Sequence, residues 1–507
     1  MSANVESFNI TFSGLRQDLK RLALVVCAGV LFFLAAVKIF TVVAFSPIMG
    51  YANNFDFIRQ SSCIGLWQSY EGKPKTSDNP IAPVNSLVFD KEINNDGCMR
   101  SADNLFPKLA TVFHAVGDRV DFREISFWKV FVLVSGACAL LFVAGGLEVG
   151  LALGVSFFLV WGDVAHLMYA NTMYFEFSVV LGVFFSGWAA MCFILEYNRK
   201  KRALVALACC SILWLGFSKQ QYMPLASVFG LICAAALFFL WKSKGLSVAF
   251  VVLSLAVPIV YADRNNETNG YMKVVSLANK TDTFLWAVLP EAKDKEAALE
   301  VLELPKTCLG GIGMSWYTPG VSIDNHPCPD IERVSRAKLI RLFIAFPSTF
   351  FEPMRKAIYS LPPFYPGNLG RFENPSEERS AKFRLLQVTS LSYWLGKVPL
   401  DVFFAGVLIS MFISPLLFVA CFLKRCSQRY RLSFALIGLG GGVVFYSIFS
   451  SVFGDGYVEF QKHAVAFLIG LSFQITGGVH ALMILSYRIV FSKCSWLASD
   501  RSAITAR

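Results

Sequence analysis

Apolar residues dominate this chain in long uninterrupted stretches, broken by short polar segments. Most of the stretches approach the ~20 residues that a helix needs to cross about 30 Å of hydrocarbon. They predict an all-α polytopic membrane protein with about ten transmembrane helices. The stretches lie at residues 22–45, 128–147, 149–167, 172–195, 203–217, 222–241, 245–261, 398–423, 432–452 and 464–487.

The composition agrees with this fold class. Of the 507 residues 55% are apolar, phenylalanine alone contributes 48, and only 16% are charged. A typical soluble domain has roughly 25% charged residues. One compact soluble core cannot bury so many apolar side chains, so the excess must face lipid. This excludes a soluble enzyme, a coiled coil and a disordered scaffold.

The net charge of +11 is a signal of topology. Lys and Arg concentrate before the first span, in alternate connections such as 199–202 and 424–431, and after the last span, while the rest of the chain is close to neutral. The positive-inside rule therefore predicts that both termini are cytoplasmic. Because the basic residues do not gather on one soluble face, nucleic acid is not an expected partner.

Two long connections fall on the predicted extracytoplasmic side, at residues 46–127 and 262–397. The expected domains are an N-terminal membrane module (1–261) that includes the first outer loop, the loop domain 262–397, and a C-terminal membrane module (398–507) with a short cytoplasmic tail. Basic and apolar residues mix along residues 334–346, which predicts an amphipathic helix. That helix would lie on the membrane surface or cover a soluble face.

Four of the 13 cysteines lie in these two outer loops: Cys63, Cys98, Cys308 and Cys328. An even number on the oxidising side of a membrane favours disulfides, most simply Cys63–Cys98 and Cys308–Cys328. The alternative is four free buried thiols. No pair has the C-x-x-C spacing of a zinc site.

Polar and ionisable residues near the spans form four clusters at the predicted outer ends. Such groups are costly beside hydrocarbon unless they are paired or functional. A transporter would normally place them at the bilayer midplane, where few are found here. Any chemistry is therefore expected at the outer surface. The clusters are Asn53 to Arg59, Trp161 to Glu176, Ser218 to Pro224 and Gly454 to His463.

The first two clusters contain candidate acids. Asp56 is flanked by aromatic residues, and burial there would raise its pKa and suit it to proton transfer. Alternatively, it caps a short helix or pairs with Arg59. Asp163 and His166 are three residues apart and share a helix face, with Glu176 nearby in the sequence. A hydrogen-bonded network is favoured there over a metal site.

The other two clusters contain candidate counter-charges. Lys219 is a counter-charge for an anionic headgroup, or a lysine that snorkels to the interface. Asp455, Glu459 and His463 follow a spacing of four residues and would form one stripe if the segment is helical. The alternative is a loop with solvated charges.

This organisation resembles the GT-C superfamily of polytopic glycosyltransferases, which take sugars from polyprenyl-phosphate carriers. The likeness rests on an acidic motif soon after the first span (Asn54-Phe55-Asp56-Phe57) and on further acids, Asp163 and Glu176, in the next outer connection. Ser218-Lys219-Gln220-Gln221 and the segment 455–463 are similar to motifs of bacterial members that build surface polysaccharides. The first motif has one Asp instead of adjacent acids, which argues against a two-carboxylate scheme.

The resemblance implies transfer of a hexosyl or pentosyl group, with inversion, from a polyprenyl-phosphate-linked donor to a glycan or lipid acceptor. The expected place is the extracytoplasmic face of a bacterial inner (plasma) membrane, in contact with membrane lipid. No cofactor is expected, and a divalent metal is possible but not supported by the residues. Asp56 would be the base, with Asp163 and Glu176 as further catalytic acids. The expected substrate-binding residues are Arg59, His166, Lys219, Gln220, Tyr222, Asp455, Glu459, Lys462 and His463, and Trp161, Tyr174 and Tyr222 would stack on sugars.

Three other functions fit parts of the pattern. A ligase that joins a lipid-linked glycan to an acceptor would use the same outer chemistry. A glycolipid transporter or flippase would need a polar path through the bundle. A structural protein would use the charged clusters only to cap helices.

Overall fold

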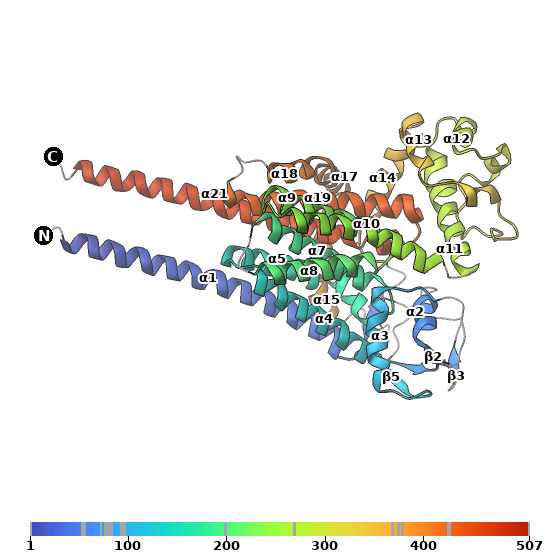
Figure 1. The fold of residues 1–507 in the computed structure, drawn as a ribbon, viewed down its shortest axis with the longest axis horizontal. Coiled ribbons are helices and arrows are strands. Elements are labelled where there is room, and N and C mark those ends of the chain that lie inside the picture. Colours follow the sequence, from blue (N-terminus) through green and yellow to red (C-terminus); the bar gives the residue numbers. More distant parts are fainter. Residues whose placement is uncertain are drawn as a thin grey trace.

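The structure is a computed structural model, and it describes residues 3–51, 57–70, 73–75, 85–91, 98–196, 200–266, 270–366, 370–372, 376, 380–422 and 427–504. The described chain is mainly helical, with six short strands. Long helices form a bundle, and the start of α1 and the end of α21 lie together at one end of it (Figure 1). The strands and helices α2, α3 and α11 to α13 lie at the opposite end, which we call the outer end.

All ten predicted stretches are helical. Two of the predicted spans are interrupted: the third by the bend between α5 and α6, and the eighth by a π-helical segment between α17 and α18. The helices are α1 (Ala3–Ala44), α4 (Phe122–Val143), α5 (Leu147–Trp161), α6 (Val164–Leu167), α7 (Glu176–Ile194), α8 (Lys201–Gly216), α9 (Met223–Phe239), α10 (Lys244–Asn266), α17 (Leu400–Leu408), α18 (Ser414–Ala420), α19 (Gln428–Asp455) and α21 (Ala466–Ile504).

The expected number of ten spans is corrected to seven or eight when length and composition are applied to the described helices. Seven segments are long and apolar enough, and Leu147–Trp161 with Val164–Asn171 makes an eighth candidate across a bend of 65°. The apolar part of α10, Lys244–Val260, is shorter than a full span. Helix α8 has 16 residues, about 24 Å at 1.5 Å per residue.

Helix α7 lies at the centre of the bundle and is surrounded by protein on every side, because each residue of α7 from Glu176 to Ile194 is buried. Helices α19 and α21 approach closely where two glycines face each other. A Cβ built on Gly440 would lie 2.4 Å from the carbonyl oxygen of Gly470, and one on Gly470 would lie 2.6 Å from that of Gly440. Small residues permit this backbone contact, as is common between membrane helices.

The first outer region contains a four-stranded antiparallel sheet in the order β3-β2-β4-β5. A disulfide joins Cys63 to Cys98, the pair named from the sequence. Strand β1 pairs with β6, so the two outer regions are hydrogen-bonded to each other. The elements are β1 (Met49–Tyr51), α2 (Phe57–Ile64), β2 (Leu66–Tyr70), β3 (Lys73–Lys75), β4 (Ser86–Phe89), η1 (Ala102–Asn104), α3 (Leu105–Ala110), η2 (Thr111–Phe113), β5 (Arg119–Asp121) and β6 (Gly370–Phe372).

The second outer region is built from short helices, and a disulfide joins Cys308 to Cys328, the other pair named from the sequence. The amphipathic segment expected over 334–346 is helical only as α13, because residues 334–337 form the turn before it. The helices are α11 (Gly270–Lys280), the π-helical η5 (Thr281–Val288), η6 (Leu289–Glu291), α12 (Lys295–Leu302), η7 (Lys306–Gly311), η8 (Pro329–Arg333), α13 (Lys338–Ala345), α14 (Ser348–Ser360), α15 (Ala381–Val388) and α16 (Leu391–Leu395).

A buried ion pair joins the first outer region to the bundle. Lys129 Nζ in α4 lies 3.6 Å from Asp103 Oδ2 in η1, and both side chains are fully buried. Lys129 also donates to the carbonyl oxygens of Tyr169 and Thr172, and Asp103 accepts from Ser178 of α7. This network fixes residues 102–104 against the outer end of α7.

Replacing Lys129 by Met should lower the free energy of unfolding by about 3–5 kcal/mol, because Asp103 would remain buried without its counter-ion. The double variant Lys129→Met/Asp103→Leu should lose clearly less than the sum of the two single losses. Thermal unfolding of the purified protein in detergent measures all three. Losses that simply add would contradict the ion-pair interpretation.

Candidate functional site

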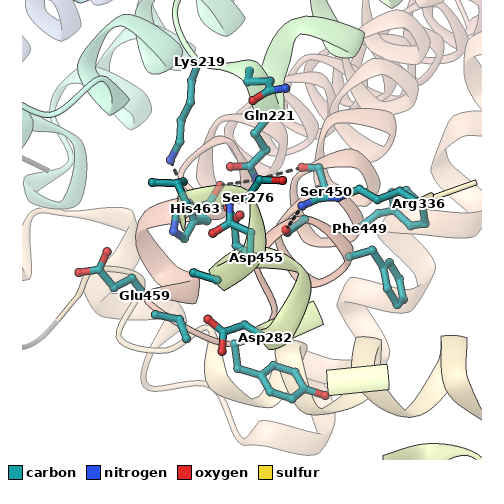
Figure 2. Close-up of a pocket in the computed structure, with 18 of the residues that line it drawn as sticks. Lys219, Gln221, Ser276, Asp282, Arg336, Phe449, Ser450, Asp455, Glu459 and His463 are labelled. Carbon is teal, nitrogen blue, oxygen red and sulfur yellow. Dashed lines mark hydrogen bonds and ion pairs between the residues drawn. The ribbon is translucent and has the colours of Figure 1, made fainter. Parts of the chain in front are cut away.

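A cavity of about 1320 Å³ lies at the outer end of the bundle. Its walls come from η4 (Gln220–Tyr222), α11, η5, α13 and the outer ends of α19 and α20 (Phe460–His463). It brings together polar residues that are far apart in the sequence (Figure 2). Of the predicted site residues, Arg59, Lys219, Gln220, Asp455, Glu459, Lys462 and His463 line it.

Lys219 reaches the cavity because the chain is extended between α8 and η4, with φ −153° and ψ 136° at this residue. The first outer region holds that extended segment. The backbone N–H of Ala102 donates to the Phe217 carbonyl oxygen at 2.7 Å, and the Ser101 hydroxyl donates to that of Ser218 at 2.5 Å. The position of Lys219 therefore depends on a segment about 115 residues earlier in the chain.

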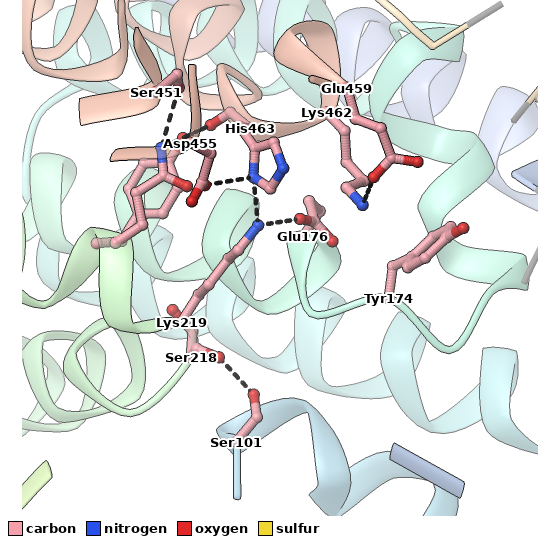
Figure 3. A network of polar contacts seen from close by, with 12 residues as sticks. Ser101, Tyr174, Glu176, Ser218, Lys219, Ser451, Asp455, Glu459, Lys462 and His463 are labelled. Carbon is pink, nitrogen blue, oxygen red and sulfur yellow. Dashed lines mark hydrogen bonds and ion pairs between the residues drawn. The ribbon is translucent and has the colours of Figure 1, made fainter. Parts of the chain in front are cut away.

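The ammonium group of Lys219 has two close partners (Figure 3). Its Nζ lies 2.7 Å from Glu176 Oε1 and 2.9 Å from His463 Nδ1. The side chain of Lys219 is 11% exposed and that of Glu176 is 2% exposed. Glu176 stands at the first residue of α7, where the helix dipole also favours a negative charge. The pair is shielded from bulk water but open to the cavity through Lys219.

His463 connects this pair to Asp455. The same ring nitrogen, Nδ1, lies 2.9 Å from Lys219 Nζ and 3.2 Å from Asp455 Oδ2. One imidazole nitrogen either accepts a hydrogen bond or donates one. Nδ1 accepts from Lys219 when it carries no proton and donates to Asp455 when it does, so the position of one proton decides which bond exists.

The predicted stripe of Asp455, Glu459 and His463 is wrong as a single helical face. Helix α19 ends at Asp455, Gly456 has φ +68°, and Glu459 has φ 45°, so the chain reverses before α20 begins. Asp455 and His463 still meet, through this reversal. Glu459 pairs instead with Lys462, whose Nζ lies over the ring of Tyr174 at 5.1 Å.

Two residues of the third cluster hold the site together. The amide nitrogen of Gln221 lies within hydrogen-bond distance of Ser450, Ser451 and the carbonyl oxygen of His463. The Tyr222 hydroxyl donates to that same carbonyl oxygen at 2.6 Å. Tyr222 is fully buried, so its predicted role in substrate binding is corrected to one of fixing the backbone of α20.

Asp163 and His166 do not line the cavity, and the structure assigns them to packing. Asp163, 1% exposed, caps α6 and accepts hydrogen bonds from the backbone N–H and hydroxyl of Ser392. The two ring nitrogens of His166 lie 2.9 and 3.2 Å from the carbonyl oxygens of Val160 and Val465. This is the hydrogen-bonded network that the sequence favoured over a metal site.

The aromatic residues expected to stack on sugars are also corrected. Trp161 is fully buried and Tyr174 is 1% exposed. Trp161 packs against Phe177 and Phe184 inside the bundle. Both rings are covered by neighbouring side chains in the protein core, so neither has a face open to a sugar.

The predicted base, Asp56, lies outside the described residues, as do Asn53 and Asn54. The described chain resumes at α2, and Arg59 on this helix lines the cavity. The Cys63–Cys98 disulfide and a bond from Met99 N–H to the Arg59 carbonyl oxygen tie α2 to the segment that holds Lys219. Residues that follow Asp56 closely are thus attached beside the cavity.

Sequence reasoning missed an acid in the second outer region. Asp282, 3% exposed, lines the cavity and accepts a hydrogen bond from the backbone N–H of Trp316 at 2.7 Å. Burial raises the pKa of Asp282 to about 7, and the nearby charge of Asp455 acts in the same direction. The only sequence feature that could have indicated Asp282 was its position as a single acid beside the apolar run Phe284 to Val288.

Gly456 allows Asp455 and Asp282 to lie close together. A Cβ at this residue would lie 2.5 Å from the carbonyl oxygen of Asp282, and its positive φ already disfavours any side chain. Glycine therefore allows the turn after α19 to press against η5. Within the described part of the chain, no group of three His, Cys, Asp or Glu side chains is arranged to hold a metal ion.

A known family model matches most of the chain. The model of the YfdI N-terminal transmembrane domain family matches residues 15–501 of the chain. Neither the curated proteins nor the solved structures contain a match. Together with the apolar helices, the match shows a multi-pass membrane protein.

The raised pKa of Asp282 predicts how stability changes with pH. In the unfolded chain this carboxyl ionises near pH 4, whereas in the folded chain it keeps its proton up to about pH 7. Stability therefore falls as pH rises through this window. Asp282→Asn cannot ionise, so its stability relative to the wild type should increase by on the order of 2–3 kcal/mol between pH 5 and pH 8.

Thermal unfolding at the two pH values measures this difference. Asp330→Asn is the matched control, because Asp330 belongs to the same outer region and its side chain is 46% exposed. The control should show the same difference from wild type at both pH values. An equally constant difference for Asp282→Asn would disprove the assigned pKa.

Proposed function

The chain belongs to the YfdI N-terminal transmembrane domain family, and we propose that it is an integral membrane glycosyltransferase of the GT-C type. In this proposal it moves a sugar from a polyprenyl-phosphate carrier to a cell-envelope glycan or lipid acceptor. The observation that carries the proposal is Lys219, a shielded cation that lines a large cavity at the outer end of the bundle.

The composition of the cavity supports a lipid-linked phosphate. Among the described residues, four cations and three acids line it, and the positive groups would stabilise a phosphate leaving group as its bond to the sugar breaks. The cations are Arg59, Lys219, Arg336 and Lys462, and the acids are Asp282, Asp455 and Glu459. Apolar side chains of α13, Leu339 and Ile340 among them, line another part of the same cavity. A phosphate with a hydrocarbon tail needs both kinds of surface.

The proposed reaction is one displacement at the anomeric carbon. An acceptor hydroxyl oxygen bonds to that carbon, the carbon–oxygen bond to the carrier phosphate breaks, and the hydroxyl proton passes to a base. Asp56 is the proposed base. Glu176 touches Lys219 but does not line the cavity, so we assign it to positioning the cation.

The proposed location is a bacterial inner membrane with the cavity on the extracytoplasmic side. The positive-inside rule supports this orientation, because Lys and Arg concentrate before the first span and after the last, and the two ends of the chain lie together opposite the outer end. The two outer disulfides agree with an oxidising compartment there.

Replacing Lys219 by Ala should lower kcat about 10²–10³-fold, the usual loss when one charge-stabilising group is removed from a transition state. Lys219→Arg should retain part of the activity because it keeps the charge. The assay follows transfer by purified protein from a panel of polyprenyl-phosphate monosaccharides to a crude lipid-linked glycan. Lys306→Ala is the control, since Lys306 is 69% exposed and pairs with Glu296 on the surface.

Wild-type protein that turns over no carrier in this panel would overturn the proposed function. Equal rates for Lys219→Ala and Lys306→Ala would leave a transferase but remove Lys219 from its mechanism.

Asp56→Asn should abolish transfer while protein abundance stays unchanged, because an amide cannot take the hydroxyl proton. Rates and membrane abundance are measured side by side for wild type and variant. Asp90→Asn, an acid after β4 that does not line the cavity, is the control and should keep full activity. Full activity of Asp56→Asn would eliminate this base assignment.

A further inference from the structure

The loop closed by the Cys308–Cys328 disulfide packs on the outer side of the cavity. The backbone N–H of Gly313 donates to the Leu285 carbonyl oxygen at 2.8 Å. Nε2 of His326 lies 2.8 Å from the Thr281 hydroxyl. With the bond from Trp316 N–H to Asp282, these contacts hold the loop along the length of η5.

This loop and η5 present aromatic rings to the cavity. Trp286, Trp316 and Tyr317 all line it, and Tyr317 is 63% exposed. Trp286 and Trp316 are partly exposed, unlike the buried Trp161. Trp286 is held edge-on by Tyr457, with ring centroids 5.5 Å apart. We call Trp286, Trp316 and Tyr317 the aromatic wall.

Asp282 adds a polar acceptor beside the aromatic wall. Its Oδ1 accepts from Trp316 N–H, and the described residues supply no donor to Oδ2, which is not enclosed by protein. Figure 2 shows Asp282 on the side of the cavity opposite Lys219, with Asp455 and His463 between them. One end of the cavity thus carries Lys219, and the other carries Asp282 together with the rings of η5 and the disulfide-closed loop. Arg336 also lines the cavity, and its guanidinium donates to the Gly454 carbonyl oxygen.

Flat aromatic faces with a few fixed polar acceptors match the chemistry of a sugar ring, which has an apolar C–H face and a rim of hydroxyl donors. They do not match a phosphate, because Asp282 in its ionised form would repel it. In the proposed function the phosphate and its sugar occupy the Lys219 side. The second substrate must then approach from the remaining side, which is formed by the outermost helices of the molecule (Figure 1).

We propose that Asp282, Trp286, Trp316 and Tyr317 form the subsite that binds the acceptor saccharide. The rings stack on the sugar face, and Asp282 Oδ2 accepts a hydrogen bond from a hydroxyl. The disulfide between Cys308 and Cys328 keeps Trp316 and Tyr317 in place. The acceptor assignment depends on the proposed function, whereas the binding of a saccharide here is tested without turnover.

Saturation-transfer difference NMR on the full chain in lipid nanodiscs tests the subsite. The probes are methyl glycosides of glucose, galactose, mannose, rhamnose and N-acetylglucosamine. We expect at least one probe to bind the wild type and to bind Trp316→Ala about tenfold more weakly, the loss of one stacking contact. Trp316→Phe, which keeps a ring, should retain part of the binding.

Two variants serve as controls. Trp394→Ala removes a tryptophan that is 60% exposed and does not line the cavity, so probe binding should be unchanged. Lys306→Ala should also keep probe binding, since Lys306 is on the surface and does not line the cavity. Mass spectrometry of the Cys308–Cys328 peptide and the elution profile show that each variant is folded. Failure of every probe to bind the wild type, or binding unaffected by Trp316→Ala, would overturn the subsite.

The transfer assay distinguishes the acceptor from the sugar on the carrier. Trp316→Ala should raise KM for the acceptor and leave KM for the donor unchanged. A rise in KM for the donor alone would assign the aromatic wall to the carrier's sugar and overturn the acceptor assignment. If no donor is turned over, the proposed function fails while the NMR result still decides whether a saccharide binds here.

Discussion

A lysine shielded from water is stable only when carboxylates or dipoles surround its ammonium group. At the outer end of the bundle, Lys219 is such a lysine, and the surrounding elements supply these groups. Glu176 at the start of α7 and His463 in α20 meet its ammonium group, and Asp455 at the end of α19 meets His463. This cation therefore links three parts of the chain that are distant in sequence. Separating them would leave Glu176, 2% exposed, without its counter-charge, which costs far more than losing an exposed ion pair.

The cavity beside this cation has two chemically different sides, and this difference underlies the proposed reaction. In the proposed function Lys219 meets the carrier phosphate, whereas the aromatic wall and Asp282, at the other end of the cavity, meet a neutral sugar. The two sides come from different regions, because the first outer region supports Lys219 through Ser101 while the second supplies Asp282. Pairing of β1 with β6 joins these regions. In the proposed function the two substrates would then meet where the two outer regions meet.

Several elements were predictable and others were not. All ten apolar stretches became helices, and the two outer disulfides join the cysteine pairs expected from the compartment. The stripe predicted over residues 455–463 is wrong because Gly456 and Glu459 adopt positive φ, and Gly456 lies close against the backbone of Asp282. From the sequence, Asp163 and Asp455 were both predicted to be site residues. It is satisfied by Ser392, more than 200 residues away, and nothing local indicates that contact.

Hydropathy alone was enough to determine a multi-pass helical membrane protein, and the distribution of charge was enough to place the polar clusters at one end of the spans. Hydropathy and charge distribution can be read segment by segment, because each polar group placed in lipid raises the free energy wherever it lies in the chain. Which acids face a cavity and which are buried by hydrogen bonds was decided only by tertiary structure. A carboxylate acquires its role from neighbours on other helices, and those neighbours exist only after the bundle has packed.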